Sequence, residues 1–538
     1  MPEAGGGCGR SWQDAGVWPP SSVPLVRRSP ELGWLAAVAF AAWLIARTAF
    51  DDLGVPAGSD WGVYLKDAAR IWVPESGLPF NDWRRPLHGY LVGLFGAERG
   101  YVEAARLISA VGGVATVVAA GVAGRALGGP WVAALAALSV PFLQVPVDAA
   151  HWTNHYGLLG AAVGLALAAG ACACRWGSVT AALAAGLFGG FAYALDLRGL
   201  AGAGTAAGLV VLALGADVAW WRRLLLPLAF AGGLALPVMQ SERVAEVAGL
   251  SAMPFDVQVR VQRALTLDAI RLEGGGQGGQ LQACIGLEPT LMTLEGLQEP
   301  CSEALFRSNL ARIRSHLPPA GLWWLLLPAF LPAVWGRRAA LAGFGVLVGP
   351  TLGALVGLAW VHGHMRYLTP LTVPLAVLIP LGLHRLTERF PLPVRVAGGL
   401  VALYLTVSWW PRISHRERAW PDAPRDRPTG LTRLADHLLA EGTDEPVIDC
   451  AGTGVEVYAL PVVLDMEVLV GASPQRCLHA LSDLAASGDA GWGVTLLRGD
   501  AATMGVVLDQ EPVESLGFER ALVVSQGAER FALWRIEP

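Results

Sequence analysis

The sequence predicts a polytopic α-helical membrane protein that ends in a small α/β domain. Composition is the first observation: 54% of the 538 residues are hydrophobic and only 15% are charged, whereas soluble domains carry roughly a quarter charged residues. The second is that apolar runs of about 18–22 residues recur along the chain, each long enough to cross a hydrocarbon core. The third is a change to short helix and strand patterns after residue 411. The net charge of −5 argues against a nucleic-acid partner.

The apolar runs predict about eleven membrane spans. Residues 1–30 contain glycines, prolines and serines without an apolar period, which indicates a disordered cytoplasmic tail. The transmembrane domain then covers residues 31–411. Its expected spans run over residues 32–50, 104–124, 130–147, 156–174, 178–195, 199–219, 224–240, 320–336, 339–361, 367–384 and 396–411.

Arginines orient these spans, because they lie in alternate connections: Arg27, Arg28, Arg125, Arg175, Arg222, Arg223, Arg337, Arg338, Arg385, Arg389 and Arg395. Cytoplasmic loops carry an excess of positive charge. We therefore expect an integral protein of the bacterial inner (plasma) membrane whose N-terminus lies in the cytoplasm. An odd number of spans leaves the C-terminal domain, 412–538, outside the cytoplasm. The loops 51–103 and 241–319 lie on the same side. The glycine-rich stretch of the second loop would let it order over a substrate, or the loop is a disulfide-tied cover.

The C-terminal segment alternates helix and strand patterns. Helix patterns cover residues 431–441 and 474–487, strand patterns cover 446–450 and 493–497, and 521–536 indicate a hairpin with its turn near Gln526. No phosphate-binding loop or nucleophile motif occurs there, so we expect no independent catalysis. The domain either recognises an acceptor or covers the site.

Four of the seven cysteines fall in outer segments, two in each. Cys284 with Cys301, and Cys450 with Cys477, would form two local disulfides in an oxidising compartment. The alternative is four unrelated small core residues. The even division between segments favours the disulfides.

Polar side chains also gather in the outer connections, where they lie outside the costly hydrocarbon. The residues concerned are Asp60, Arg84, Arg85, His88, Asp148, His151, Asn154, His155, Asp196, Arg198, His362, His364 and Arg366. This one-sided layout indicates an active site at the outer boundary of the membrane. As alternatives, Asp196 and Arg198 form only a tight turn with a local ion pair, and the two histidines at 362 and 364 occupy one face of a strand. As a metal site, that pair lacks further ligands.

Three motifs carry a resemblance to a known superfamily. An outer loop opens with an acidic residue in Gly58-Ser59-Asp60-Trp61 and continues to Arg84-Arg85-Pro86-Leu87, and a late span opens with Arg366-Tyr367-Leu368-Thr369-Pro370. Their order and topology resemble the GT-C superfamily of membrane glycosyltransferases, in particular the protein O-mannosyltransferase and aminoarabinose-transferase branch. Here Trp61 follows Asp60 where the superfamily commonly has a second acidic residue. Asp148 or Asn154 occupies the position of the acidic residue after the third span.

The resemblance implies a GT-C-like fold that transfers a sugar from a polyprenyl-phosphate carrier to a lipid, glycan or protein acceptor. Asp60 would be the general base and Asp148 a second catalytic group. Arg84, Arg85 and Arg366 would hold the lipid phosphate. The residues expected to bind substrate are Tyr64, His88, His151, Asn154, His155, Asp196, Arg198, His362 and His364. These residues identify no particular cofactor, the use of a divalent cation is left open, and the lipid-linked sugar is the donor substrate. Membrane lipids are the remaining partner.

Two functions from other classes compete with this one. A transporter or flippase would have paired repeats, broken helices and polar groups near the membrane centre. A non-catalytic subunit of a cell-envelope glycan assembly system would use its outer domain to bind a partner. The one-sided polar loops and the order of the motifs favour the glycosyltransferase.

Overall fold

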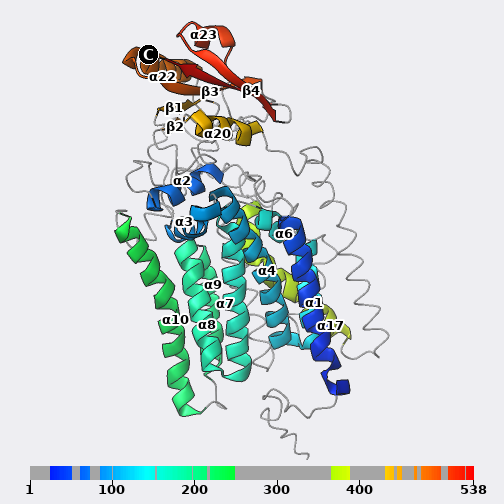
Figure 1. Ribbon diagram of the computed structural model, residues 1–538. Helices are drawn as coiled ribbons and strands as arrows, with labels where there is room; N and C mark the ends of the chain where they lie inside the picture. The colour runs from blue at the N-terminus through cyan, green and yellow to red at the C-terminus, as the bar shows by residue number, and fades with distance from the viewer. Residues whose placement is uncertain are drawn as a thin grey trace, which may run out of the picture.

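The computed structural model of the chain describes residues 25–50, 61–72, 85–99, 101–151, 154–196, 198–214, 219–248, 365–387, 430–441, 445–450, 466–468, 474–498, 507–526 and 529–537. These residues form a bundle of long helices and a small α/β domain beyond one end of it (Figure 1).

The bundle is built from helices of different lengths. They are α1 (Leu25–Phe50), α4 (Tyr101–Gly128), α5 (Pro130–Ser139), the 3-10 turn η3 (Val140–Phe142), α6 (Gln144–His151), α7 (Tyr156–Trp176), α8 (Val179–Leu195), α9 (Gly199–Leu212), α10 (Trp220–Val247), the 3-10 helix η6 (Met365–Leu371) and α17 (Thr372–Thr387). Helices α2 (Trp61–Trp72) and α3 (Leu87–Arg99) lie across the end that is nearer the α/β domain (Figure 1).

We call this the domain end; it also holds the start of α7 at Tyr156 and the end of α8 at Leu195. The opposite end holds the last turns of α4 and α7.

Among the described residues, four helices are long and apolar enough to cross a membrane, namely α1, α4, α7 and α10. They confirm apolar helices of spanning length where spans were expected, over 32–50, 104–124, 156–174 and 224–240. Helices α8, α9 and α17 are apolar but shorter. The expected spans 320–336, 339–361 and 396–411 lie outside the described residues, so the total of eleven stays a prediction.

The span expected over 130–147 is broken. Helix α5 with η3 and helix α6 meet at a bend of 61°, and Leu143 between them has an extended backbone. Proline lacks an N–H to donate and its ring clashes with the preceding turn. Pro141 lies in η3 and Pro146 in α6, on either side of the break, and both favour it.

Helices α2 and α3 fall within the outer loop 51–103, where the sequence analysis identified no helix. Leu65, Ala68 and Ala69 of α2 are buried in one cluster with Val92 of α3 and Ala104 of α4. Such short helices are stabilised by packing against the bundle rather than by crossing the membrane.

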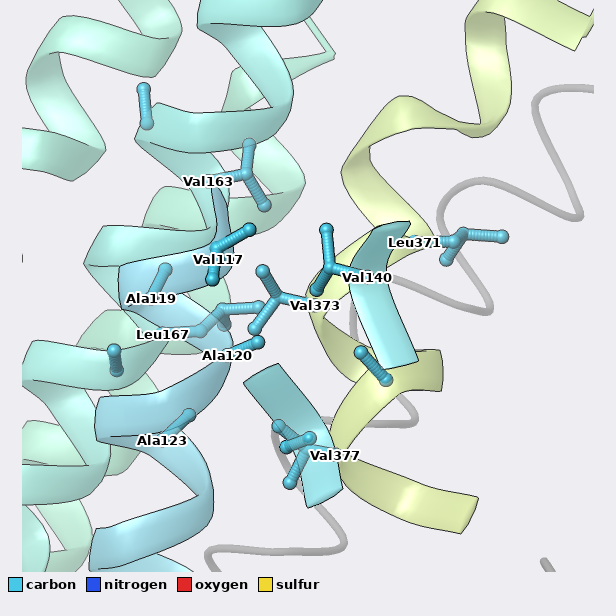
Figure 2. Packing of buried hydrophobic residues seen from close by; sticks show 14 of the residues in the cluster. Val117, Ala119, Ala120, Ala123, Val140, Val163, Leu167, Leu371, Val373 and Val377 are labelled. Atoms are coloured by element: carbon cyan, nitrogen blue, oxygen red, sulfur yellow. The ribbon is translucent and has the colours of Figure 1, made fainter. Parts of the chain in front are cut away.

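Apolar side chains pack the central helices against one another. Val117 and Ala120 of α4 pack with Val163 and Leu167 of α7 and with Val373 of α17 (Figure 2). Lipid tails are as apolar as leucine, so helix association in a membrane depends on close packing.

Glycine is required where α8 crosses α10. A Cβ atom at Gly186 would overlap the carbonyl oxygen of Phe230, and one at Gly190 would overlap that of Leu234. This crossing fixes the position of α8, whose last turn carries residues of the candidate site.

The α/β domain contains a five-stranded sheet in the order β2-β1-β3-β5-β4. The strands are β1 (Val447–Asp449), β2 (Met466–Val468), β3 (Gly491–Arg498), β4 (Glu519–Gln526) and β5 (Glu529–Ile536). Strand β1 is parallel to both β2 and β3, whereas β5 is antiparallel to both β3 and β4. The helices are α20 (Gly430–Glu441), α22 (Pro474–Ser487) and α23 (Gln510–Glu514).

Side chains alternate between the two faces of this sheet, as the strand period requires. Leu533 packs with Leu438 of α20 on one face, and Trp534 packs with Leu481 of α22 on the other. The expected helices, the strands near 446–450 and 493–497 and the hairpin are confirmed, while β2 and α23 were not predicted. The disulfide between Cys450 and Cys477 is also confirmed, with Cα atoms 5.6 Å apart. Cys284 and Cys301 lie outside the described residues.

Candidate functional site

A carboxylate at the domain end is bound by three groups. Asp196 ends α8 with an extended backbone, which turns its side chain back toward the start of α7. Its Oδ1 accepts a 2.8 Å hydrogen bond from the backbone N–H of Arg198, and its Oδ2 lies 3.0 Å from Nε2 of His155 and 3.7 Å from the Arg198 guanidinium. Arg198 also donates to the Tyr156 hydroxyl at 2.8 Å. The turn and local ion pair considered for Asp196 and Arg198 therefore exist, and they are extended by His155 and Tyr156.

This network keeps Asp196 ionised. Burial would raise the pKa of Asp196, but the charge of Arg198, the hydrogen bond and charge of His155 and the backbone N–H outweigh it, so the pKa is held well below its usual range. An ionised carboxylate only accepts hydrogen bonds. The His155 nitrogen that faces it, Nε2, therefore carries a proton.

His155 lies among aromatic rings from other segments. Its ring centroid is 5.1 Å from that of Tyr64 in α2 and 6.1 Å from that of His88 in α3, and Tyr64 and His88 are 5.8 Å apart in an edge-to-face arrangement. All three side chains are buried. Residues from two outer connections of the sequence, the loop 51–103 and the segment before α7, thus meet in one cluster.

A second contact joins α8 to the segment before α3. The guanidinium carbon of Arg85 lies 3.9 Å from the ring centroid of Tyr193, which is buried in the last turn of α8. The separation is well within the range of a cation–π interaction. Arg85 itself is half-buried, and no acceptor for its Nε occurs among the described residues.

The start of α7 is fixed by Asn154. Its Oδ1 accepts a 3.1 Å hydrogen bond from the backbone N–H of Tyr156, which satisfies one of the free donors at a helix start. Its carbonyl oxygen accepts a 3.2 Å hydrogen bond from Ser109 of α4. The amide oxygen of Asn154 thereby orients the segment that carries His155 and Tyr156; its expected role in substrate binding stays a prediction.

Other candidates lie apart from these contacts or outside the described chain. The ring nitrogens of His151 lie 2.7 Å from the carbonyl oxygen of Val147 and 2.9 Å from that of Thr48, so His151 ties α6 to α1. Asp148 is buried in α6, and Arg366 belongs to η6. The remaining candidates, Asp60, Arg84, His362 and His364, are outside the described residues.

The described residues include no group of three or more His, Cys, Asp or Glu side chains that could hold a metal ion. His155 and Asp196 are two such groups, and both oxygens of Asp196 accept hydrogen bonds, from His155 and from the backbone of Arg198. A divalent cation at this pair would need further ligands.

Solved structures match along nearly the whole chain. ArnT from Cupriavidus metallidurans, in a crystal structure with bound undecaprenyl phosphate, has a TM-score of 0.56 and 15% identity over 93% of this chain and 98% of its own. Its apo form gives 0.54 and 15% over 94% and 98%. The Archaeoglobus fulgidus oligosaccharyltransferase AglB, in complex with an inhibitory peptide and a dolichol-phosphate, gives 0.46 and 13% over 86% and 69%. No protein-family model and no curated protein sequence matches the chain.

The chain has the GT-C fold. The resemblance based on the Asp60 loop, the Arg84–Leu87 motif and the late Arg366 motif is thereby confirmed at the level of the fold. Beyond the helix bundle, the chain has the small five-stranded sheet domain at its C-terminal end.

Sequence reasoning missed Tyr193 and gave no role to Tyr156. Tyr193 stands inside an apolar run that was assigned only to a membrane span. Its position in the last turn of that run, three residues before Asp196, was the available signal.

Proposed function

We propose that this chain is a glycosyltransferase that moves a sugar from a polyprenyl-phosphate carrier to an acceptor at the outer face of a bacterial inner membrane. The observation that carries the proposal is the convergence of Tyr64, His88, His155 and Asp196 at one end of a GT-C bundle. ArnT, which shares this fold along almost its full length, binds undecaprenyl phosphate.

The donor end of the reaction requires positive charge. As the bond between the sugar and the lipid phosphate breaks, negative charge grows on the departing phosphate. The planar guanidinium of arginine presents several donors that match phosphate oxygens, and such preorganised charge is often the largest catalytic contribution. Arg85 is the described candidate, and Arg84 and Arg366 are its proposed partners.

The acceptor end requires a base. The acceptor hydroxyl loses its proton as it attacks the anomeric carbon. Asp60 immediately precedes α2, which carries Tyr64 into the cluster, so it is the proposed base. Asp148, buried in α6, is the proposed second carboxylate.

The cluster around His155 suits a sugar or acceptor that carries hydroxyl groups. Asp196 fixes the proton on Nε2 of His155, and Arg198 fixes the Tyr156 hydroxyl. Imidazole and phenol groups both donate and accept hydrogen bonds, so His88, His155 and Tyr64 can bind neutral hydroxyls. A lipid, a glycan or a protein acceptor would each present a hydroxyl that this chemistry can bind.

The proposed topology places the N-terminus in the cytoplasm and the α/β domain outside. The disulfide between Cys450 and Cys477 supports an oxidising compartment for that domain. In spheroplasts, a cysteine introduced by Asp483→Cys, at an exposed position of α22, should react with a membrane-impermeant maleimide. Labelling that requires permeabilised spheroplasts would contradict the outer location.

Reconstitution with a defined donor tests the function. The protein in vesicles is given a radiolabelled polyprenyl-phosphate sugar and an envelope extract as acceptor source, and transfer of label is measured. Asp60→Asn should abolish transfer. Glu103→Gln is the matched control, because Glu103 is an exposed carboxylate at the start of α4, at the same end of the bundle.

Near-normal turnover by Asp60→Asn would contradict the assignment of the base. Movement of the lipid-linked sugar across the vesicle membrane without transfer would favour a flippase instead. Normal envelope assembly in cells that carry only Asp60→Asn would favour a non-catalytic subunit.

A further inference from the structure

The contact between Arg85 and Tyr193 is unusual for an arginine beside a membrane helix. Arg85 directly precedes Pro86 and the start of α3, whereas Tyr193 belongs to the last turn of α8. The guanidinium carbon is 3.9 Å from the centre of the phenol ring, so the cation lies over the ring rather than beside its hydroxyl. The contact joins segments more than one hundred positions apart.

Stacking has a geometric consequence for the guanidinium. All its N–H groups lie in one plane. A guanidinium that lies parallel to the ring at this 3.9 Å separation directs the donors at its edge away from the ring. The Nε atom is buried, and no described residue accepts a hydrogen bond from it. A phosphate that approaches along this edge can accept two parallel hydrogen bonds.

The position of Tyr193 is itself well determined. Its side chain is 7% exposed, and α8 is held against α10 by the close approach at Gly190. Three residues further on, Asp196 binds His155 and Arg198. The end of α8 thus fixes the aromatic surface for Arg85 and the anchor of the imidazole cluster together.

We infer that Tyr193 is a positioning residue that holds the Arg85 guanidinium, edge outward, for the phosphate of a polyprenyl-phosphate ligand. The inference rests on the proposed function and adds a residue to it. Tyr193 acts through its ring, and its hydroxyl is not required. If Tyr193 were purely structural, its substitution would lower stability and would weaken the binding of undecaprenyl phosphate and of undecaprenol alike.

The experiment measures binding of undecaprenyl phosphate, and of uncharged undecaprenol, to the full chain in nanodiscs. Tyr193→Leu should weaken undecaprenyl phosphate binding about tenfold and leave undecaprenol binding unchanged. Tyr193→Phe keeps the ring and should restore most of the lost affinity. Tyr101→Leu is the matched control, because it removes another buried tyrosine ring from the same end of the bundle.

The double variant Arg85→Ala with Tyr193→Leu completes the test. Because Tyr193 acts through Arg85, the double variant should bind no more weakly than Arg85→Ala alone. A full second loss, or a Phe variant as weak as the Leu variant, would overturn the inference.

Failure of the proposed function and failure of the role of Tyr193 would give different results in this experiment. If undecaprenyl phosphate binds no better than undecaprenol and Arg85→Ala changes nothing, the phosphate site itself is absent. If Arg85→Ala weakens binding while Tyr193→Leu does not, the phosphate site stands and the role of Tyr193 is wrong.

Discussion

The two ends of the helix bundle both contain arginines, but they use them differently. At the opposite end, Arg125 of α4 binds Glu31 of α1 through hydrogen bonds of 2.6 and 3.2 Å, and Arg175 of α7 donates to the carbonyl oxygen of Arg125 at 3.4 Å. At the domain end, Arg85 stacks on Tyr193, and Arg198 binds Asp196 beside an imidazole.

The comparison distinguishes arginines that hold helices together from charged residues that orient groups able to take part in a reaction. Arginines that bind helix carbonyls and a single carboxylate tie α1, α4 and α7 together and satisfy the last carbonyls of a helix. At the domain end, Asp196 instead fixes His155, which lies against Tyr64. The imidazoles of His88 and His155, groups that exchange protons near neutral pH, thus meet at the domain end.

The largest expected effect comes from removing one arginine at each end. Arg85→Ala should lower kcat/KM for sugar transfer by at least about 100-fold, because it removes a charge that stabilises the departing phosphate. Arg125→Ala should leave kcat/KM within about twofold and act on stability alone. Transfer kinetics and thermal melting of both variants in the same detergent check this. Equal losses of activity would break the distinction between the two ends.

A smaller loss is expected from the carboxylate that orients His155. Asp196→Asn removes the charge that holds the proton on Nε2, so the imidazole should lose its fixed orientation and transfer should fall about tenfold. The control is Asp483→Asn, because Asp483 pairs with His479 on an exposed face of α22, 3.5 Å apart. Unchanged transfer by Asp196→Asn would show that the pair only stabilises the turn.

The sequence predicted features of these two ends that depend on local residue patterns, and it missed features that depend on packing between distant segments. The long helices followed from apolar runs, and the sheet domain followed from alternation, because each is a local property. His88, His155, Asp196 and Arg198 could be assigned to one end, since connections on one side of a bundle must lie near each other.

The parts that could not be predicted arise from packing. Helices α2 and α3 are short, and their burial depends on partners in α4. In the sequence, Tyr193 is indistinguishable from the other residues of an apolar run, and only the structure shows that Arg85 lies over its ring. His151 stands beside a chemically rich segment, yet its nitrogens face backbone carbonyls. Strand β2 has only three residues, too few for a periodic pattern.

At the opposite end, loss of the ion pair should be mild. Glu31→Gln removes a partly exposed pair, and such pairs contribute about 0–1 kcal/mol to the free energy of unfolding. The melting temperature should fall by about 2 °C or less, and transfer should be unchanged. A loss of transfer would show that the opposite end also takes part in function.

The smallest expected effect is on the melting temperature at low pH. The folded pKa of Asp196 lies below its unfolded value, so its contribution to stability is complete above about pH 4 and is lost as the pH falls through the folded pKa. The melting temperature should therefore fall more steeply below about pH 4 in the wild-type chain than in Asp196→Asn. Parallel curves would indicate that the network around Asp196 does not stabilise the fold.

One measurement tests the central claim most directly: a cryo-EM structure of the chain in nanodiscs with undecaprenyl phosphate. We predict headgroup density at the domain end, against the edge of the Arg85 guanidinium that rests on Tyr193. Headgroup density beside Arg125 and Arg175 at the opposite end, or lipid density without a phosphate near Arg85, would contradict the account.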